Sequence, residues 1–173
     1  MNSFESGQRK LIPAVLIYLR VGREYLLIHR DQSTADFHHG FWNGLGGKLE
    51  AGESSVEAAI REVREESGLN LTESDLSPLG ILHFPNFKPH RQEDWHCTIF
   101  MVELLQKPAV RNSSEGTLHW QKESDILNLP LWPGDHLFLP KVFAREPFVG
   151  TIWYHDRKVT RHDIRTMGAV FKN

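Results

Sequence analysis

Three glutamates, Glu62, Glu65 and Glu66, lie within five residues of one another in this sequence. On a helix, residues three and four apart are neighbours, so these side chains would gather three negative charges. Like charges repel, so the cluster does not serve helix stability. The ordinary alternative is a solvated acidic face of a surface helix. A hard divalent cation explains the cluster better, because Mg²⁺ takes oxygen ligands and is usually shared between protein carboxylates and substrate phosphates.

The helix that would carry these glutamates has a clear start and end in the sequence. Ser54 and Glu57 have the spacing of a capping box, which satisfies free amide groups in the first turn. Apolar residues then recur at helical spacing and predict a buried stripe, formed by Val56, Ala59, Ile60 and Val63. Gly68 can take the left-handed conformation that ends a helix, and Leu69 can pack back on it. We therefore expect one amphipathic helix between Ser54 and Gly68.

A glycine-rich turn, Gly44-Leu45-Gly46-Gly47, directly precedes this region. Without side chains, its backbone can approach a ligand closely enough to offer a carbonyl to a cation or to meet a phosphate. A solvated acidic face would not require such a turn. The glycines and the glutamates together favour a Mg²⁺ site built for a polyphosphate.

The stretch from Gly47 to Leu69 resembles the Nudix box, the signature of hydrolases that act on a nucleoside diphosphate linked to another group. The pattern reads Gly, five residues, Glu, seven residues, Arg-Glu, a hydrophobic residue, any residue, Glu-Glu, any residue, Gly and a hydrophobic residue. The chain fills every fixed position of this pattern, with Gly47, Glu53, Arg61, Glu62, Val63, Glu65, Glu66, Gly68 and Leu69. The resemblance implies a Nudix-type α/β/α sandwich with a mixed β-sheet between helices.

The resemblance also implies roles for individual residues. Metal binding falls on Glu62, Glu65 and Glu66, with the backbone of Gly46 as a further ligand. Arg61 is expected to pair with Glu53 and so to orient the helix. Three carboxylates compete for the role of general base, namely Glu65, Glu66 and Glu115. The remaining expectations are that Glu115 also touches the metal, that Mn²⁺ can replace Mg²⁺, and that the substrate contacts Gly46, Gly47 and Lys48.

Beyond the box, the chain looks most similar to the MutT-like 8-oxo-dGTP diphosphatases, which release pyrophosphate and leave the monophosphate. Trp42-Asn43-Gly44 precedes the box, Glu115 lies five positions before Trp120, and Trp132-Pro133-Gly134-Asp135 follows. The resemblance implies that Asn43, Trp132 and Asp135 contact a purine base, with Phe84 as a further wall. It also implies hydrolysis of 8-oxo-dGTP or related purine nucleotides, and thus nucleotide-pool sanitation in DNA repair.

Ordinary structural roles remain open for these residues: a turn for Asn43, a helix cap for Asp135, and core packing for Trp132 and Phe84. One position also departs from the animal enzymes, in which Trp-Pro is followed by two aspartates. Here Gly134 takes the place of the first, so a single carboxylate remains. Asp135 and the amide of Asn43 can still read a guanine or 8-oxoguanine edge. This departure is expected to affect the range of oxidised bases that the protein accepts.

Composition narrows the class of protein. The chain has 173 residues, which suits a single domain over 1–173, and we expect residues 1–10 to be frayed. A formal charge of −2 provides no basic field for a polynucleotide, so the expected partner is a small nucleotide. The single cysteine, Cys97, excludes an internal disulfide and is expected to be a buried thiol. No apolar run approaches the length of a membrane span, and we expect a cytoplasmic protein.

Taken in order, the chain predicts strands that surround two or three helices. Strands are expected at 11–19, 25–28, 79–84, 96–104 and 119–121, followed by a late hairpin over 149–154 and 158–160. A short helix is expected within 122–129, and a further one from Asp135 to Ala144 with Asp135 as its cap. His38 and His39 belong to a polar loop and have no metal-ligand partner at suitable spacing.

Two rival functions remain. One is a different Nudix activity, on ADP-ribose, nucleotide sugars or the 5′ triphosphate of RNA, which the Trp42-Asn43 and Trp132-Pro133 pairs disfavour. The other is a non-catalytic nucleotide-binding module on the same fold. Degenerate binders usually lose carboxylates of the box, whereas this chain keeps all of them. A catalytic role is therefore the better interpretation. The oligomeric state cannot be read from the sequence.

Overall fold

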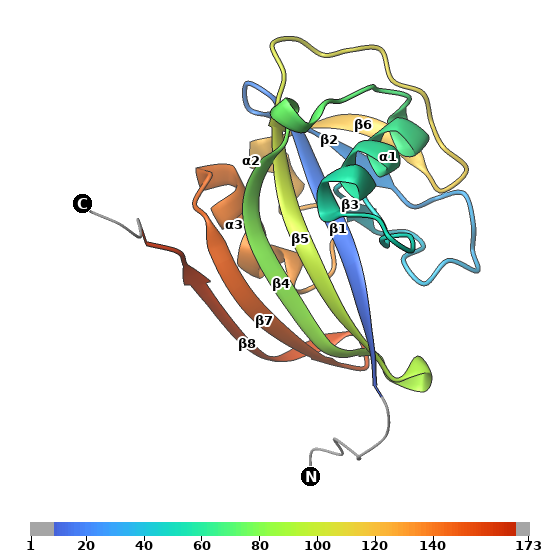
Figure 1. The fold of residues 1–173 in the computed structure, drawn as a ribbon, viewed down its shortest axis with the longest axis vertical. Coiled ribbons are helices and arrows are strands. Elements are labelled where there is room, and N and C mark those ends of the chain that lie inside the picture. Colours follow the sequence, from blue (N-terminus) through green and yellow to red (C-terminus); the bar gives the residue numbers. More distant parts are fainter. Residues whose placement is uncertain (1–8, 169–173) are drawn as a thin grey trace.

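A mixed eight-stranded sheet forms the centre of the computed structural model, which describes residues 9–168 (Figure 1). The strands are β1 (Lys10–Val21), β2 (Glu24–His29), β3 (Trp42–Asn43), β4 (Ser77–Lys88), β5 (Glu93–Glu103), β6 (Thr117–Lys122), β7 (Phe148–His155) and β8 (Lys158–Thr166). Their order is β3-β2-β1-β5-β4-β7-β8, with β6 paired to β2. β1 runs parallel to β5 and β4 runs parallel to β7, whereas the other pairs are antiparallel.

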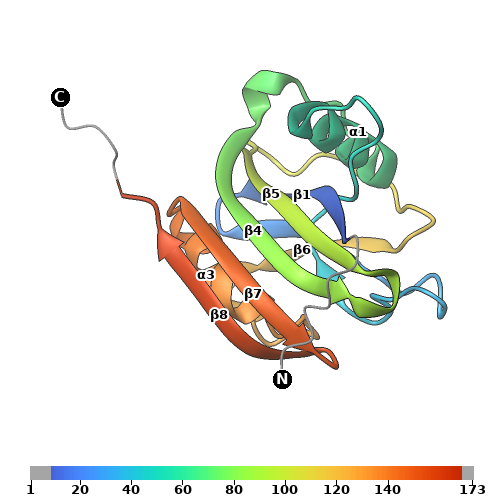
Figure 2. The ribbon, with the colours of Figure 1, turned by 60° about the horizontal axis from the view of Figure 1, so that its bottom comes forward.

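Helices cover both faces of this sheet (Figure 2). On one face α1 (Ser55–Ser67) packs on a core that includes Val15, Ile17 and Leu19 of β1. On the other face lie α2 (Glu123–Ile126) and α3 (Asp135–Ala144), whose core takes Ala14 and Tyr18 from the same strand. Alternate residues of a strand point to opposite faces, which explains how one strand serves both cores. The predicted α/β/α sandwich with a mixed sheet is confirmed.

The ends of α1 follow the sequence prediction. The hydroxyl of Ser54 accepts a hydrogen bond from the Glu57 amide at 3.2 Å, and the Glu57 carboxylate accepts one from the Ser54 amide at 2.8 Å. Gly68 ends the helix with φ +79°. The capping box and the glycine therefore fix the length of α1 and the direction in which its glutamates point.

Several boundaries differ from the predicted ones. β4 continues past Phe84 to Lys88, because a register shift between these residues takes up Pro85, which has no amide for the ladder. β8 is longer than expected and pairs with β7 up to Thr166. The expected fraying is wrong for Arg9 and Lys10: the Arg9 guanidinium bonds to Asp94 and Lys10 begins β1. Residues 1–8 of that prediction lie outside the described residues.

Helices in the described range 9–168 are all too short or too polar to cross a membrane. The expected burial of Cys97 is confirmed, since this thiol lies within the core beneath α3.

Candidate active site

The glycine turn and α1 are joined by a hydrogen bond between backbone and side chain. The amide of Gly46 donates to Oε2 of Glu66 at 2.8 Å, and Glu66 is only 3% exposed. Gly46 has φ +145°, and a Cβ at this position would lie 2.1 Å from the carbonyl oxygen of Val15. Only glycine fits there, so the turn lies directly on β1 and faces the end of α1.

Glu62 approaches the same turn from one helical turn earlier. A Cβ on Gly47 would lie 2.4 Å from Oε1 of Glu62, so the absence of a side chain at 47 makes room for this carboxylate. Burial raises the pKa of the Glu62 carboxyl, although Arg61 acts in the opposite direction. The two glycines therefore place two carboxylates of α1, Glu62 and Glu66, against one stretch of backbone.

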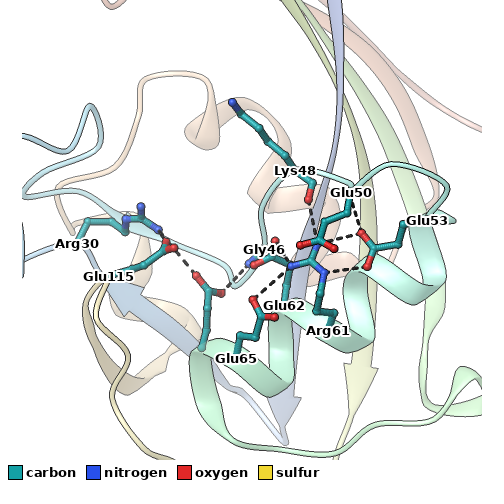
Figure 3. Close-up of polar contacts among 10 residues, drawn as sticks. Arg30, Gly46, Lys48, Glu50, Glu53, Arg61, Glu62, Glu65 and Glu115 are labelled. Atoms are coloured by element: carbon teal, nitrogen blue, oxygen red, sulfur yellow. Dashed lines mark hydrogen bonds and ion pairs between the residues drawn. The ribbon is translucent and has the colours of Figure 1, made fainter.

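Arg61 connects the residues of the box to one another (Figure 3). Its guanidinium binds both oxygens of Glu53, at 2.8 and 2.9 Å, and donates to the Lys48 carbonyl at 3.0 Å. It also bonds to Glu62 at 2.9 Å and to Glu65 at 3.3 Å. The bonds to Glu53 are the main reason that the pKa of Arg61 is raised, so its charge is permanent. The arrangement is the Arg61–Glu53 pair that the sequence predicts.

Glu115 reaches this region from the turn before β6, which is brought close because β6 pairs with β2. Arg30, just after β2, donates to Oε2 of Glu115 at 2.5 Å and lies 3.8 Å from Oε1 of Glu66. Arg30 also bonds to Asp36 at 2.7 Å. Glu65 behaves differently, because it is 55% exposed and pairs with Arg61. Of the predicted carboxylates, Glu62, Glu66 and Glu115 converge, and Glu65 stays at the margin.

The carboxylate of Glu66 is buried close to other negative charges. Burial raises its pKa to about 8, and the negative charges of Glu115 and Glu62 add to the effect. Its Oε1 is buried without a hydrogen-bond partner among residues 9–168. The same residues do not contain three His, Cys, Asp or Glu side chains grouped tightly enough to form a metal site as they stand. A divalent cation fits the donor set, because it would offset the crowded charge and give Oε1 a partner.

A cavity of about 550 Å³ opens beside these carboxylates. Glu62, Glu115 and the backbone of Gly46 and Gly47 line one end, together with Arg30. The lining also includes the predicted base contacts Asn43, Phe84, Trp132 and Asp135, of which Phe84 and Trp132 form an aromatic end through their contacts with Phe87. Cavities of 300–1,000 Å³ are typical of small-molecule sites. One cavity therefore joins a carboxylate end to an aromatic end.

The aromatic end is built around Trp132. Its ring stacks on Phe41 at 4.9 Å and on Phe37 at 5.1 Å, and its buried Nε1 has no hydrogen-bond partner in the described part of the chain. Positive charge borders these rings: Arg157 lies 5.9 Å from Trp132, and Lys88 lies 5.1 Å from Phe37. Lys48 turns its ammonium toward Trp95, at 5.3 Å, and away from the carboxylates of α1 (Figure 3).

Asp135 is not the helix cap that the sequence suggests. Gly134 is the N-cap of α3, and Asp135 is the first helical residue. The carboxyl group lines the cavity instead, and burial raises its pKa to about 8. The preceding Trp-Pro-Gly turn, closed by a bond from the Asp135 amide to the Trp132 carbonyl, gives this position its orientation. A carboxyl that is free of capping is available to a ligand.

Sequence reasoning missed several residues of the site: Arg30, Asp36, Phe37, His38 and Tyr154. The first four belong to the loop after β2, which was expected to be only a polar connection. Its Phe37 and His38 instead pack on Trp132, and burial lowers the pKa of His38 to about 4, so the ring is neutral. The available signal was the presence of two phenylalanines, Phe37 and Phe41, in an otherwise polar loop. Tyr154 gave none, because it lies on a distant strand.

Comparison with known proteins agrees with this architecture. A family model described as the NUDIX domain matches residues 10–142. The chain is 32% identical over 142 residues to the oxidized purine nucleoside triphosphate hydrolase of Danio rerio, with 82% of this chain and 84% of the relative covered. It is 37% identical over 97 residues to the Nudix hydrolase YvcI of Bacillus subtilis, which covers 56% of this chain and 60% of that relative.

Among solved structures, the MutT protein from Bacillus halodurans superposes with a TM-score of 0.75 at 25% identity, covering 88% of this chain and 97% of that one. The fold and the box thus define a Nudix domain. The chain belongs to the Nudix family and is a Nudix hydrolase. Members of this family generally use divalent metal ions and act on small nucleotide substrates.

Proposed function

We propose that this protein is a Mg²⁺-dependent nucleoside triphosphate pyrophosphohydrolase that converts 8-oxo-dGTP or a related purine nucleotide to the monophosphate and pyrophosphate. The observation that carries the proposal is the two-ended cavity. Its carboxylate end suits a metal-bound polyphosphate, and its aromatic end suits a purine. The oxidized purine nucleoside triphosphate hydrolase of Danio rerio supports the same substrate class.

The metal would be held by Glu62, Glu66 and Glu115 with the backbone of Gly46, and Glu65 is the peripheral member of the predicted set. When bound, a divalent cation neutralises phosphate oxygens and lowers the pKa of a coordinated water. Mn²⁺ has similar oxygen chemistry and is the expected substitute. The buried Oε1 of Glu66 supports this assignment, because it has no hydrogen-bond partner among residues 9–168 and its nearest cation is Arg30 at 3.8 Å. Arg61 positions Glu62 and, through Glu53 and Lys48, holds the turn against α1.

Glu115 is the best placed of the three candidates for the general base. It lines the cavity and is 49% exposed, so water can reach its carboxylate. Glu66 is buried and bonds to Gly46, and Glu65 lies beside Arg61. A general base must lie within reach of the water whose proton it takes. Arg30, which bonds to Glu115, would keep this carboxylate oriented between turnovers.

At the other end, Phe84 and the edge of the Trp132 ring, whose faces stack on Phe37 and Phe41, would border the base. Asn43 and Asp135 would read its polar edge. An amide offers both donors and an acceptor, and a carboxyl offers an acceptor in either protonation state. Gly47 and Lys48 also line the cavity and would contact the phosphates or the sugar. The site is thus proposed to recognise the base through hydrogen bonds and the triphosphate through the cation.

A substrate panel tests the proposal. The wild-type enzyme with Mg²⁺ should release pyrophosphate from 8-oxo-dGTP with a higher kcat/KM than from dCTP, ADP-ribose, a nucleotide sugar or RNA with a 5′ triphosphate. Glu66→Gln should retain the fold and lose at least about a hundredfold in kcat, since it removes a metal-binding charge. Glu73→Gln, at a carboxylate outside the cavity, is the matched control and should leave kcat unchanged.

Asp135→Ala separates base recognition from catalysis. Loss of a buried hydrogen bond to the base costs about 1–3 kcal/mol, which is about tenfold to a hundredfold in kcat/KM. The loss should fall on 8-oxo-dGTP and dGTP and should spare dCTP, which depends on the metal end. Equal losses for all three nucleotides would mean that Asp135 only supports the structure. Turnover of ADP-ribose above every triphosphate would overturn the proposed substrate class.

A further inference from the structure

Tyr154 occupies the space that a side chain at position 134 would fill. Its hydroxyl oxygen accepts a hydrogen bond from the Gly134 amide at 2.8 Å. A Cβ built on Gly134 would lie 2.3 Å from that oxygen. Gly134 is the position at which the chain lacks the first carboxylate of the Trp-Pro-acidic pattern. Where the pattern has a carboxylate, this chain therefore has the phenol of Tyr154, which belongs to β7.

The backbone of β7 directs Tyr154 to this place. The pairing of β7 with β8 shifts register between Trp153 and Tyr154, which marks an irregularity of the β-bulge type. Such irregularities turn a side chain toward a site. The Tyr154 ring contacts the aromatic end of the cavity, edge-on to Trp132 at 5.9 Å and near Phe87 at 5.6 Å. Tyr154 and Asp135 both line the cavity.

The hydrogen-bonding state of the phenol is defined by these contacts. One lone pair of the Tyr154 oxygen is used by the Gly134 amide, and no residue in the range 9–168 accepts the hydroxyl proton. Burial, with the charge of Asp135, raises the pKa of Tyr154, so the hydroxyl stays protonated at neutral pH. The Tyr154 side chain lines the cavity and its hydroxyl proton has no acceptor among residues 9–168, so the phenol has a donor left for a ligand, whereas an ionised carboxylate would present only acceptors.

We propose that Tyr154 is a specificity-determining residue, whose hydroxyl donates to the 6-oxo group of a guanine-type base and disfavours a 6-amino purine. This inference rests on the proposed function and narrows its substrate class. Guanine carries an O6 acceptor where adenine carries an N6 amino donor. A donor that faces an amino group leaves both donors unpaired, which is costly in a desolvated site. The Asp135 carboxyl then remains to accept from the ring N–H of guanine.

The test is the ratio of kcat/KM for dGTP to kcat/KM for dATP, measured by pyrophosphate release. Both substrates meet the same fraction of active enzyme, so the ratio does not depend on how much of a variant is folded. Tyr154→Phe should lower kcat/KM for dGTP by about tenfold to a hundredfold and should change that for dATP by less than about threefold. Tyr25→Phe, which removes another buried tyrosine hydroxyl outside the cavity, is the matched control and should leave the ratio unchanged.

Two variants at position 134 provide an independent route. Gly134→Ala places a Cβ where the hydroxyl lies, so it should displace Tyr154 and lower the ratio even if Tyr154→Phe folds poorly. The double variant Gly134→Asp with Tyr154→Phe places a carboxylate at position 134 and removes the hydroxyl that would lie 2.3 Å from its Cβ; the ring of residue 154 and Ile152, at 3.2 Å, must then shift slightly. It should raise kcat/KM for dATP relative to Tyr154→Phe.

The outcomes are distinguishable. Equal loss on dGTP and dATP in Tyr154→Phe would show that the hydroxyl only supports Gly134, and would overturn this inference while the proposed function stands. If the wild-type enzyme releases pyrophosphate from no purine triphosphate, the proposed function fails and this inference fails with it.

Discussion

Replacement of Asp135 by asparagine tests whether the base end of the cavity is as desolvated as the structure indicates. Burial raises the pKa of this carboxyl from 3.8 to about 8. The folded state therefore keeps the proton over a range of pH in which the unfolded chain has released it. Stability is then highest below pH 4, falls as the pH rises toward 8, and is level above that value. Asparagine has nearly the same shape and no proton to release, so the variant should lack this dependence.

The size of the effect follows from the same pKa. Each pH unit between the two values corresponds to about 1.4 kcal/mol. From pH 5 to pH 8 the wild-type protein would lose at most about 4 kcal/mol of unfolding free energy through this group. Asp135 lines an open cavity that water can enter, so the expected loss is smaller, about 1–2 kcal/mol. The Asp135→Asn variant should therefore gain about that much relative to the wild type between pH 5 and pH 9.

Urea denaturation at pH 5, 7 and 9 in the presence of a chelator measures the difference between the two proteins. Other titrating groups, including Glu66, are common to both and cancel in that difference. Asp125→Asn, at an exposed carboxylate on α2, is the matched control and should show no such trend. If the free energies of the wild type and Asp135→Asn differ by the same amount at all three pH values, the Asp135 carboxyl is hydrated and ionised, and the reasoning about the cavity is refuted.

Three further perturbations test the scaffold and the chemistry. Gly46→Ala should lower the unfolding free energy measured by urea denaturation by more than about 2 kcal/mol, because its Cβ would meet the Val15 carbonyl oxygen. The control Gly52→Ala, whose Cβ would meet open space, should lower it by about 1 kcal/mol. Equal losses would show that close packing at Gly46 does not matter. Glu115→Gln should lower kcat about a hundredfold or more with little change in KM, measured by pyrophosphate release, and normal turnover would exclude Glu115 as the base. Ser54→Ala should cost about 1 kcal/mol in unfolding free energy, since it removes the hydroxyl that caps α1, and an unchanged stability would show that the cap is replaced by water.

The sequence alone determined the local features of this protein. The start of α1 at Ser54, its end at Gly68 and its buried stripe depend on residues within one or two helical turns, where spacing is a direct guide to contact. The Arg61–Glu53 pair, which joins the loop before α1 to the middle of that helix, was expected from the resemblance to the box. Runs of apolar residues likewise indicated strands, and these together with the resemblance indicated the layered sandwich.

The boundaries that the sequence misjudged depend on pairing between strands. Pro85 argued for the end of β4, yet β5 lies alongside and the register shift accommodates a residue without an amide. Asp135 has the residue type of a cap, but the turn from Trp132 makes Gly134 the cap and directs the carboxyl into the cavity. In the first case strand pairing with β5 outweighed the preference of proline for a strand end. In the second case the turn from Trp132 outweighed the preference of aspartate for a cap position.

The composition of the active site was decided by the tertiary structure. Glu115 reaches the glutamates of α1 only because β6 pairs with β2, and Arg30 reaches both because it lies at the end of that same strand. Tyr154 meets Gly134 across twenty positions of sequence, through the register shift in β7. Strand order and packing set the distances between these residues, and of the three only Glu115 was expected, through the resemblance. The sequence therefore specified the helix of the box and, through the resemblance, Glu115, whereas only the fold shows that Arg30 and Tyr154 join the candidate site.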